Sequence, residues 1–206
     1  MKTLIIGSGD FAAPSDINDR FIIACDGGLE HCAKNGIRPD KILGDFDSVT
    51  QTSLDLYNDI PKTKFPVKKD MTDIELGLEL AFELGTDDLV ITGALSGTRL
   101  DHTLCNIQLL LKCLKRGINA VLINKTNEIR LLGGDNKLHI KNEGKYVSLL
   151  PVTMEVVGIT LKGFEYPLEN YTLEKGSSLC VSNIIIGDSG EIVLKNGICA
   201  VICAKD

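Results

Sequence analysis

The sequence predicts a mostly parallel α/β domain followed by a small antiparallel β-sandwich, and two observations support this fold class. In the first 125 of the 206 residues, short apolar runs alternate with amphipathic helical patterns, which is typical of a parallel sheet covered by helices. After about residue 126 the helical patterns end, and short apolar runs separated by Gly, Asn and Asp indicate antiparallel strands. We therefore expect two domains, residues 1–125 and residues 126–206.

Five short apolar runs in the first domain are the predicted strands of the parallel sheet. Strands that helices bury on both faces are mostly apolar, as these runs are. They are Leu4–Ile6, Phe21–Cys25, Lys41–Leu43, Leu89–Thr92 and Ala120–Asn124.

Two helices are well marked in the same domain. Thr72 and Glu75 form a capping-box pattern at the start of the first helix, and Gly85 ends it. The second helix is expected from about Asp101 to Arg116. The apolar residues predicted to face the core are Ile74, Leu78, Ala81 and Phe82 in the first helix and Leu104, Ile107, Leu111 and Leu114 in the second.

The second domain is predicted to consist of short strands. Their lengths and the turn residues between them suit a sandwich of two antiparallel sheets. The predicted strands are Glu128–Leu132, Lys137–Ile140, Tyr146–Leu150, Val156–Leu161, Leu179–Ser182, Glu191–Leu194 and Ile198–Ala204.

The composition is that of an ordinary soluble globular protein, with 44% apolar and 24% charged residues. The net charge of −6 argues against a nucleic acid or an anionic membrane as partner, because both would be repelled. An acidic protein that binds a nucleotide needs a cation to bridge the like charges. In this sequence no apolar stretch reaches the length of a membrane span.

The seven cysteines, most of them inside apolar runs, are expected to be reduced core residues. Their odd number and the lack of a Cys-x-x-Cys pair disfavour a disulfide framework and a zinc site, so we expect a cytoplasmic protein. The opening segment Met1–Gly7 is too short for a signal peptide and is expected to be a strand.

Residues that could carry chemistry gather after the predicted strands, at the sheet edge where open α/β proteins bind ligands. The first group is Asp26-Gly27-Gly28. Two glycines at a strand-to-helix turn let the backbone approach a ligand and direct helix N–H groups at it. The alternative is a plain turn in which the glycines serve only the backbone geometry.

The second group, Gly44–Ser48, contains Asp45 and Asp47. In an extended segment residues i and i+2 point the same way, so these carboxylates are expected to face one ligand. Close carboxylates repel each other unless a cation lies between them, and their oxygens suit Mg²⁺. The alternative is an acidic surface turn, which the apolar Phe46 between the two acids disfavours.

The third group places Asp70 and Asp73 at the start of the capped helix, directly after Lys68-Lys69. Acids often occur at this place for a structural reason alone, because the helix dipole stabilises them.

In the fourth group, the small-residue loop Gly93–Thr98 precedes Arg99, Asp101 and His102. Backbone N–H groups of such a loop can hold phosphates, and the planar guanidinium of Arg99 suits phosphate oxygens. Asp101 is either a further acid of the site or the helix N-cap. His102 at this position is more often a packing or capping residue than a catalyst.

Three common motifs are missing from the sequence. Gly7-Ser8-Gly9 lacks the third glycine of the dinucleotide-binding fingerprint, and no Gly-Lys-Ser/Thr follows it as a P-loop requires. The Gly-x-Ser-x-Gly elbow of α/β-hydrolases is also missing.

In their order and spacing these groups resemble the motifs of the thiamine pyrophosphokinase family, and the resemblance covers nearly the whole chain. The motifs that carry it are Asp26–Gly28, Pro39-Asp40, Gly44–Ser48, Lys69–Asp73, Arg99–His102, Asn106, Gly158–Pro167 and Ser182-Asn183.

By this resemblance, the protein would use Mg²⁺ to transfer the pyrophosphoryl group of ATP to the hydroxyl of thiamine, giving thiamine diphosphate and AMP. The resemblance also implies a homodimer, with an α/β domain that binds ATP and Mg²⁺ and a β-sandwich that binds thiamine and dimerises. Two alternatives stay open: a pyrophosphokinase for another primary alcohol such as a pterin, and a non-catalytic nucleotide- or vitamin-binding protein.

The resemblance implies a role for each candidate residue. Asp45, Asp47 and Asp73 would hold Mg²⁺, and Arg99 would stabilise charge on the transferring group. Asp70 or Asp101 would orient Mg²⁺-bound water or accept the alcohol proton. The nucleotide would contact Asp26, Gly27, Gly28, Gly97, Thr98, Arg99, His102 and Asn106, and thiamine would contact Asp26, Ser182 and Asn183.

Overall fold

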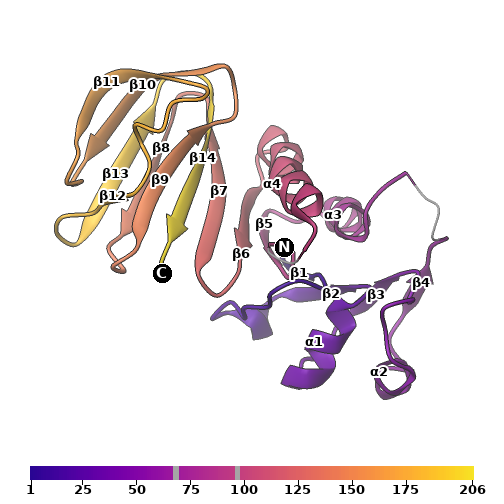
Figure 1. Ribbon diagram of the computed structural model, residues 1–206. Helices are drawn as coiled ribbons and strands as arrows, with labels where there is room; N and C mark the ends of the chain where they lie inside the picture. Colours follow the sequence, from indigo (N-terminus) through magenta and orange to yellow (C-terminus); the bar gives the residue numbers. More distant parts are fainter. Residues whose placement is uncertain (67–69, 96–97) are drawn as a thin grey trace. The chain divides into compact units, whose positions relative to one another are not determined.

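The computed structural model describes residues 1–66, 70–95 and 98–206 (Figure 1). The chain divides into two compact units, Met1–Lys125 and Thr126–Asp206. All the α-helices among the described residues lie in the first unit, and the second unit is built from strands.

As the sequence predicts, a parallel sheet forms the centre of the first unit. Its strand order is β6-β5-β1-β2-β3-β4. Each neighbouring pair in this order runs parallel. From β1 the chain adds β2, β3 and β4 on one side, whereas β5 and β6 are added on the other side, so the connections diverge between β1 and β5. The strands are β1 (Lys2–Ile6), β2 (Phe21–Cys25), β3 (Lys41–Gly44), β4 (Lys62–Lys64), β5 (Asp88–Thr92) and β6 (Asn119–Ile123).

Helices cover both faces of this sheet, which explains why the central strands β1, β2 and β5 are mostly apolar and buried, whereas the edge strand β4 is polar. Leu4 and Ile6 of β1 share a core cluster with Leu29 of α1. Ile5 faces the other side, where a Cβ at Gly77 of α3 would lie 3.3 Å from its side chain. Figure 1 shows α1 and α2 on one face and α3 and α4 on the other. The helices are α1 (Gly28–Asn35), α2 (Gln51–Leu56), α3 (Asp73–Glu83) and α4 (Leu100–Lys115), with a short 3-10 helix η1 (Ile17–Asp19) after β1.

Helix α3 begins with the predicted cap. The hydroxyl of Thr72 accepts a hydrogen bond from the N–H of Glu75 at 3.2 Å. Gly85 follows the helix with a φ of 73°, a left-handed conformation that favours glycine and ends the helix. The carboxylate of Glu75 binds the ammonium of Lys112 at 2.6 Å, which ties α3 to α4.

The predicted core face of α4 is wrong. Leu104 is 52% exposed, and the residues that the helix buries are Asn106, Leu109, Leu110 and Cys113. Apolar residues surround most of this helix, so periodicity alone does not select one face. The buried face also contains a polar residue, Asn106, whose side-chain N–H donates to the carbonyl of Ala94 at 2.8 Å. A prediction that counts only apolar residues as buried cannot include a buried polar residue such as Asn106.

The second unit is a sandwich of two antiparallel sheets, as predicted, in the orders β12-β9-β14-β7 and β11-β10-β13-β8. Leu149 and Val201 from the first sheet and Ile159 and Ile192 from the second lie in one core cluster. The strands are β7 (Asn127–Gly133), β8 (Asn136–Lys141), β9 (Tyr146–Pro151), β10 (Glu155–Lys162), β11 (Leu168–Glu174), β12 (Asn183–Ile184), β13 (Ser189–Leu194) and β14 (Ile198–Ala204).

The prediction of a strand at Leu179–Ser182 is wrong, because this segment is a turn. The N–H of Val181 donates to the carbonyl of Ser178 at 3.1 Å, and Ser182 has a left-handed φ of 61°. Only the side chain of Cys180 is buried, whereas Leu179 and Val181 are exposed. Two strands in this region were missed: the short β12, and β11, whose mostly polar and exposed side chains show little apolar alternation.

The seven cysteines are free thiols, six of them buried and Cys105 partly so. Burial raises the pKa of the thiols of Cys32, Cys113 and Cys199 to about 12, which makes these groups unreactive at neutral pH. Within the described part of the chain, no helix combines the length and the apolar character needed to cross a membrane.

Candidate active site

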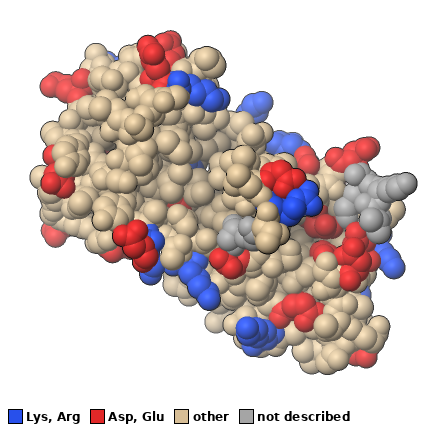
Figure 2. All heavy atoms as spheres, in the orientation of Figure 1, with Lys and Arg blue, Asp and Glu red and all other residues tan. Residues whose placement is uncertain are grey.

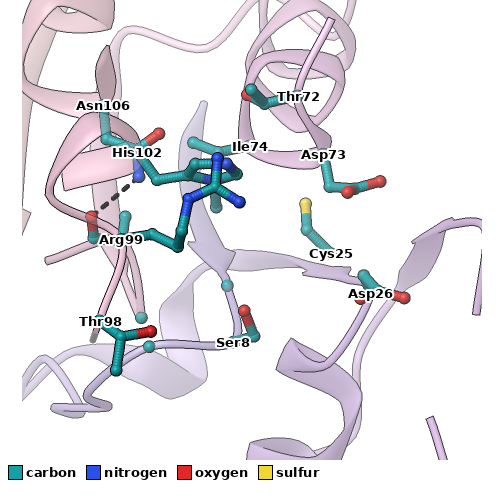
Figure 3. Close-up of a pocket in the computed structure, with 14 residues that line it drawn as sticks. Ser8, Cys25, Asp26, Thr72, Asp73, Ile74, Thr98, Arg99, His102 and Asn106 are labelled. Atoms are coloured by element: carbon teal, nitrogen blue, oxygen red, sulfur yellow. Dashed lines mark hydrogen bonds between the residues drawn. The ribbon is translucent and has the colours of Figure 1, made fainter. Parts of the chain in front are cut away.

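A cavity of about 410 Å³ opens at the carboxyl ends of β1, β2 and β5 in the first unit (Figure 3). It lies where the connections of the sheet diverge, which is the usual ligand position in open α/β sheets. The described residues that line it are Gly7, Ser8, Gly9, Cys25, Asp26, Thr72, Asp73, Ile74, Gly93, Ala94, Thr98, Arg99, His102 and Asn106. The structure thus brings together six of the predicted site residues: Asp26, Asp73, Thr98, Arg99, His102 and Asn106.

Asp26 is held at the end of β2 in an unusual backbone conformation. Its φ is 47°, while its N–H donates to the carbonyl of Leu43 at 2.7 Å and its carbonyl accepts from Leu29 of α1 at 3.0 Å. Its Oδ1 is buried and has no hydrogen-bond partner among the described residues. Burial raises the pKa of Asp26, and the negative charges of Asp73 and Asp45 raise it further. A bound cation would offset this unfavourable arrangement.

Asp45 and Asp47 converge, although not for the reason that the sequence suggests. The segment after β3 is not extended, because Phe46 has a left-handed φ of 67°. The N–H of Asp47 instead donates to Oδ1 of Asp45 at 3.1 Å, which closes a small turn. Phe46 is partly buried against the core below α1 and α2, so its ring anchors the turn.

Asp26, Asp45 and Asp47 each offer one carboxylate oxygen, and these three oxygens lie within 4.8 Å of one another. Hard oxygen donors are what Mg²⁺ requires, and the unpartnered Oδ1 of Asp26 agrees with a cation-binding role. The residues therefore fit this metal. The family resemblance groups Asp73 with Asp45 and Asp47, whereas the structure groups Asp26 with them and places Asp73 on the cavity wall beside Asp26 (Figure 3).

Arg99 lies across the cavity from Asp26 and Asp73 (Figure 3) and is paired with Asp101. Its Nε is 2.9 Å and its terminal nitrogen 2.6 Å from the two oxygens of Asp101. Hydrogen bonding to Arg99 lowers the pKa of Asp101 to about 2. Helix α4 starts at Leu100 with Arg99 at the N-cap position, so the interpretation of Asp101 as the cap is wrong.

The remaining predicted residues have different surroundings. Asp70 is exposed and is not among the described residues of the cavity wall. Gly28 has a packing role, because a Cβ there would lie 1.9 Å from the carbonyl oxygen of Ile6. Gly97 lies outside the described residues, as do Lys68 and Lys69 of the third motif.

Ser182 and Asn183 belong to the second unit, where their polar groups support the turn before β12. The N–H of Ser182 donates to the hydroxyl of Ser148 at 3.0 Å. The buried side chain of Asn183 accepts from the N–H of Tyr166 at 3.1 Å and donates to its carbonyl at 2.8 Å. The amide of Asn183 therefore fixes the backbone of Tyr166.

The segment Gly7-Ser8-Gly9 lines the cavity, and reasoning from the sequence missed it. The segment matches neither the dinucleotide-binding fingerprint nor a P-loop, so no known motif marks it. The available signal was simpler: a loop of small residues directly after the first strand of a parallel sheet.

Comparison with protein families gives two matches that together span most of the chain. Residues 17–122 match the model described as "Thiamin pyrophosphokinase, catalytic domain". Residues 135–199 match the model described as "Thiamin pyrophosphokinase, vitamin B1 binding domain".

Similar proteins carry the same description. Thiamine pyrophosphokinase of Bacillus subtilis is 36% identical over 187 residues, which are 89% of this chain and 87% of the relative. The crystal structure of the Bacillus subtilis enzyme superimposes with a TM-score of 0.91 at 30% identity, covering all of both chains. That of thiamin pyrophosphokinase from Geobacillus thermodenitrificans has a TM-score of 0.86 at 30% identity, covering all of this chain and 98% of the other. These similarities confirm the predicted fold class.

Proposed function

This chain belongs to the thiamin pyrophosphokinase family, and we propose that it transfers the pyrophosphoryl group of ATP to the hydroxyl of thiamine, giving thiamine diphosphate and AMP. One observation supports this activity most directly: carboxylates and a guanidinium face each other across a single cavity at the sheet's carboxyl edge. Pyrophosphoryl transfer depends on neutralising and aligning phosphate groups, and this arrangement supplies both signs of charge.

The acids would hold Mg²⁺. We assign Asp45, Asp47 and Asp73 as ligands, and we add Asp26 because its oxygen lies within 4.8 Å of those of Asp45 and Asp47. Bound there, Mg²⁺ would neutralise charge on the phosphates, which the four carboxylates would otherwise repel.

Arg99 would bind the phosphate chain from the opposite wall, with Asp101 as its positioning residue. A carboxylate with a pKa of about 2 is a weak base at neutral pH, so Asp101 is better suited to holding Arg99 than to accepting the thiamine proton. Asp70 is the remaining candidate from the motif for proton transfer. Thr98, His102 and Asn106 would contact the nucleotide, together with Gly27, Gly28 and Gly97 of the loops.

We further propose that residues 126–206 bind thiamine, through Ser182 and Asn183, and form a homodimer. Tyr146, Val181 and Ile184 are exposed apolar side chains around the β9–β12 pair, as expected of a surface that a partner covers. The free cysteines suit the reducing cytoplasm. The net charge of −6 and the mixed charges on the face shown in Figure 2 argue against a nucleic-acid partner.

The direct test is to incubate the purified protein with thiamine, ATP and Mg²⁺ and to measure both products. Thiamine diphosphate and AMP should appear in equal amounts, and chelation of the metal should stop the reaction. A panel that replaces thiamine with a hydroxymethyl pterin tests the acceptor. Turnover of the pterin alone, or binding of thiamine without turnover, would contradict the proposal.

A further inference from the structure

The loop Gly7-Ser8-Gly9 lines the cavity, and the proposed roles of the acids and Arg99 assign no function to it. It leaves β1 where the connections of the sheet diverge, so it faces the position where a ligand is expected. The two glycines are turned toward the neighbouring loop: a Cβ at Gly7 would lie 2.6 Å, and one at Gly9 2.9 Å, from the carbonyl oxygen of Gly93. Ser8 between them is exposed.

Hydrogen bonds fix this loop to the loop after β5. The N–H of Gly7 donates to Thr92 at 2.8 Å, and the N–H of Gly9 donates to Gly93 at 2.7 Å. In return, the N–H of Gly93 donates to the carbonyl of Asp10 at 3.1 Å. The backbone around Ser8 is therefore held in place before any ligand binds.

Ser8 itself stands between the acidic wall and the cationic wall. Figure 3 shows its side chain between Asp26 on one side and Thr98 and Arg99 on the other. It also lies next to the start of α1, since a Cβ at Gly27 would be 2.9 Å from the Cβ of Ser8. A phosphate group that spans the two walls passes a hydroxyl that can donate a hydrogen bond without adding charge.

His31 of α1 provides a second support for the loop. Its Nε2 lies 2.7 Å from the carbonyl oxygen of Gly9, and because a carbonyl only accepts, Nε2 carries the proton. The imidazole is stacked on the ring of Phe11, with centroids 5.4 Å apart and planes inclined by 19°. The ring is thus held from two sides while it fixes the residue after Ser8.

We propose that the Ser8 hydroxyl donates a hydrogen bond to the phosphate chain of the nucleotide, and that His31 is the positioning residue which holds Ser8 in place through Gly9. This inference rests on the proposed function, because it takes the ligand to be ATP. It adds a neutral donor to the charged groups already assigned.

Ser8→Ala tests the contact. Binding of a non-hydrolysable ATP analogue with Mg²⁺, measured by calorimetry, should weaken by roughly tenfold, as for the loss of a hydrogen bond to a charged group. The KM for ATP should rise in parallel while the KM for thiamine stays unchanged. Ser189→Ala, at an exposed serine of β13 in the second unit, is the matched control and should behave as the wild type. Analogue affinity of Ser8→Ala within twofold of the wild type would overturn the contact.

His31→Ala tests the positioning role. It should raise the KM for ATP, and His31→Gln, which keeps a side-chain N–H donor, should restore part of the loss. In the Ser8→Ala background His31→Ala should have no further effect on analogue binding, because its action passes through Ser8. An equal effect in both backgrounds would overturn that role.

Analogue binding also separates this inference from the proposed function. Normal turnover by the wild type, together with an unchanged analogue affinity and KM for ATP in Ser8→Ala, would leave the function standing and remove Ser8 from the site. A wild type that does not turn over thiamine, but whose analogue binding is weakened by Ser8→Ala, would remove the function and support Ser8.

Discussion

Replacing Asp26 by Asn should stabilise the metal-free protein and impair its activity. Asparagine tolerates the left-handed backbone at this position, where φ is 47°, so the substitution removes a charge without forcing the turn to change. The charge removed is half-buried and close to two others, and burial with the charges of Asp73 and Asp45 raises its pKa. The native site is therefore under electrostatic strain when no cation is bound.

The size of this effect follows from the spacing of the carboxylates. Two unit charges at the 4.8 Å limit of the group repel each other by about 1 kcal/mol in a water-like medium and by about 3 kcal/mol at an effective dielectric constant near 20. Because the site opens to solvent, we expect the lower figure. A gain of about 1 kcal/mol in the free energy of unfolding corresponds to a rise of roughly 2–4 °C in Tm for a chain of this size.

Thermal unfolding in EDTA and in excess Mg²⁺ with an ATP analogue is the assay. Asp26→Asn should melt above the wild type in EDTA, and ligand should raise its Tm by less than it raises that of the wild type. Turnover should fall in the same variant. Asp135→Asn, at an exposed position between β7 and β8, is the control for loss of one negative charge elsewhere. Equal Tm values for Asp26→Asn and wild type in EDTA, with equal shifts on adding ligand, would refute this reasoning.

Three further predictions follow from other charged groups. Asp47→Asn, at an exposed position, should reduce turnover by roughly two orders of magnitude or more without lowering Tm, and unchanged activity would exclude Asp47 from the site. Asp101→Asn should raise the KM for ATP by at most about fivefold, as expected for an exposed pair with Arg99, whereas a collapse of kcat at constant KM would identify a proton acceptor. Asp16→Asn should lower the free energy of unfolding by about 1 kcal/mol, because Asp16 pairs with the buried Arg20. The pKa of Asp16 is lowered to about 2, so this stabilisation is present above pH 3.8 and is lost as the pH falls through about 2. If denaturation curves still show a stability difference between Asp16→Asn and the wild type below that pH, the role of the ion pair is disproved.

The sequence predicted those parts of the fold that depend on interactions between residues close together in the chain. β2 and β14 have the predicted bounds, because continuous apolar runs between turn residues leave little choice. Thr72 caps α3 because only the chain directly after it is needed to form that bond.

The errors concern residues whose environment comes from distant parts of the chain. The buried side chain of Asn106 donates a hydrogen bond to the carbonyl of Ala94, which lies in another segment of the chain. The residues next to Asn106 in the sequence do not indicate this contact. Phe46 has a left-handed backbone, and its ring packs against the core between the sheet and α1. The segment that was expected to be an extended strand end is therefore a loop.

The candidate site shows the same division. The acids at Asp45 and Asp47 stand out in the sequence by type and spacing, whereas Ser8 is an ordinary residue in an ordinary loop. Its place becomes visible only once β1 and β5 are known to be neighbours. The grouping of Asp26 with Asp45 and Asp47 likewise depends on the pairing of β2 with β3.

The contact between the loops after β1 and β5 also limits how this protein could be redesigned. A Cβ at Gly93 would lie 2.1 Å from the carbonyl oxygen of Gly7, and one at Gly7 would lie 2.6 Å from that of Gly93. Neither position can gain a side chain while the other loop stays where it is. A library that randomises either position alone should return glycine in its functional clones. New side chains at this wall of the cavity require that both loops be varied together, with the strands beneath them left unchanged.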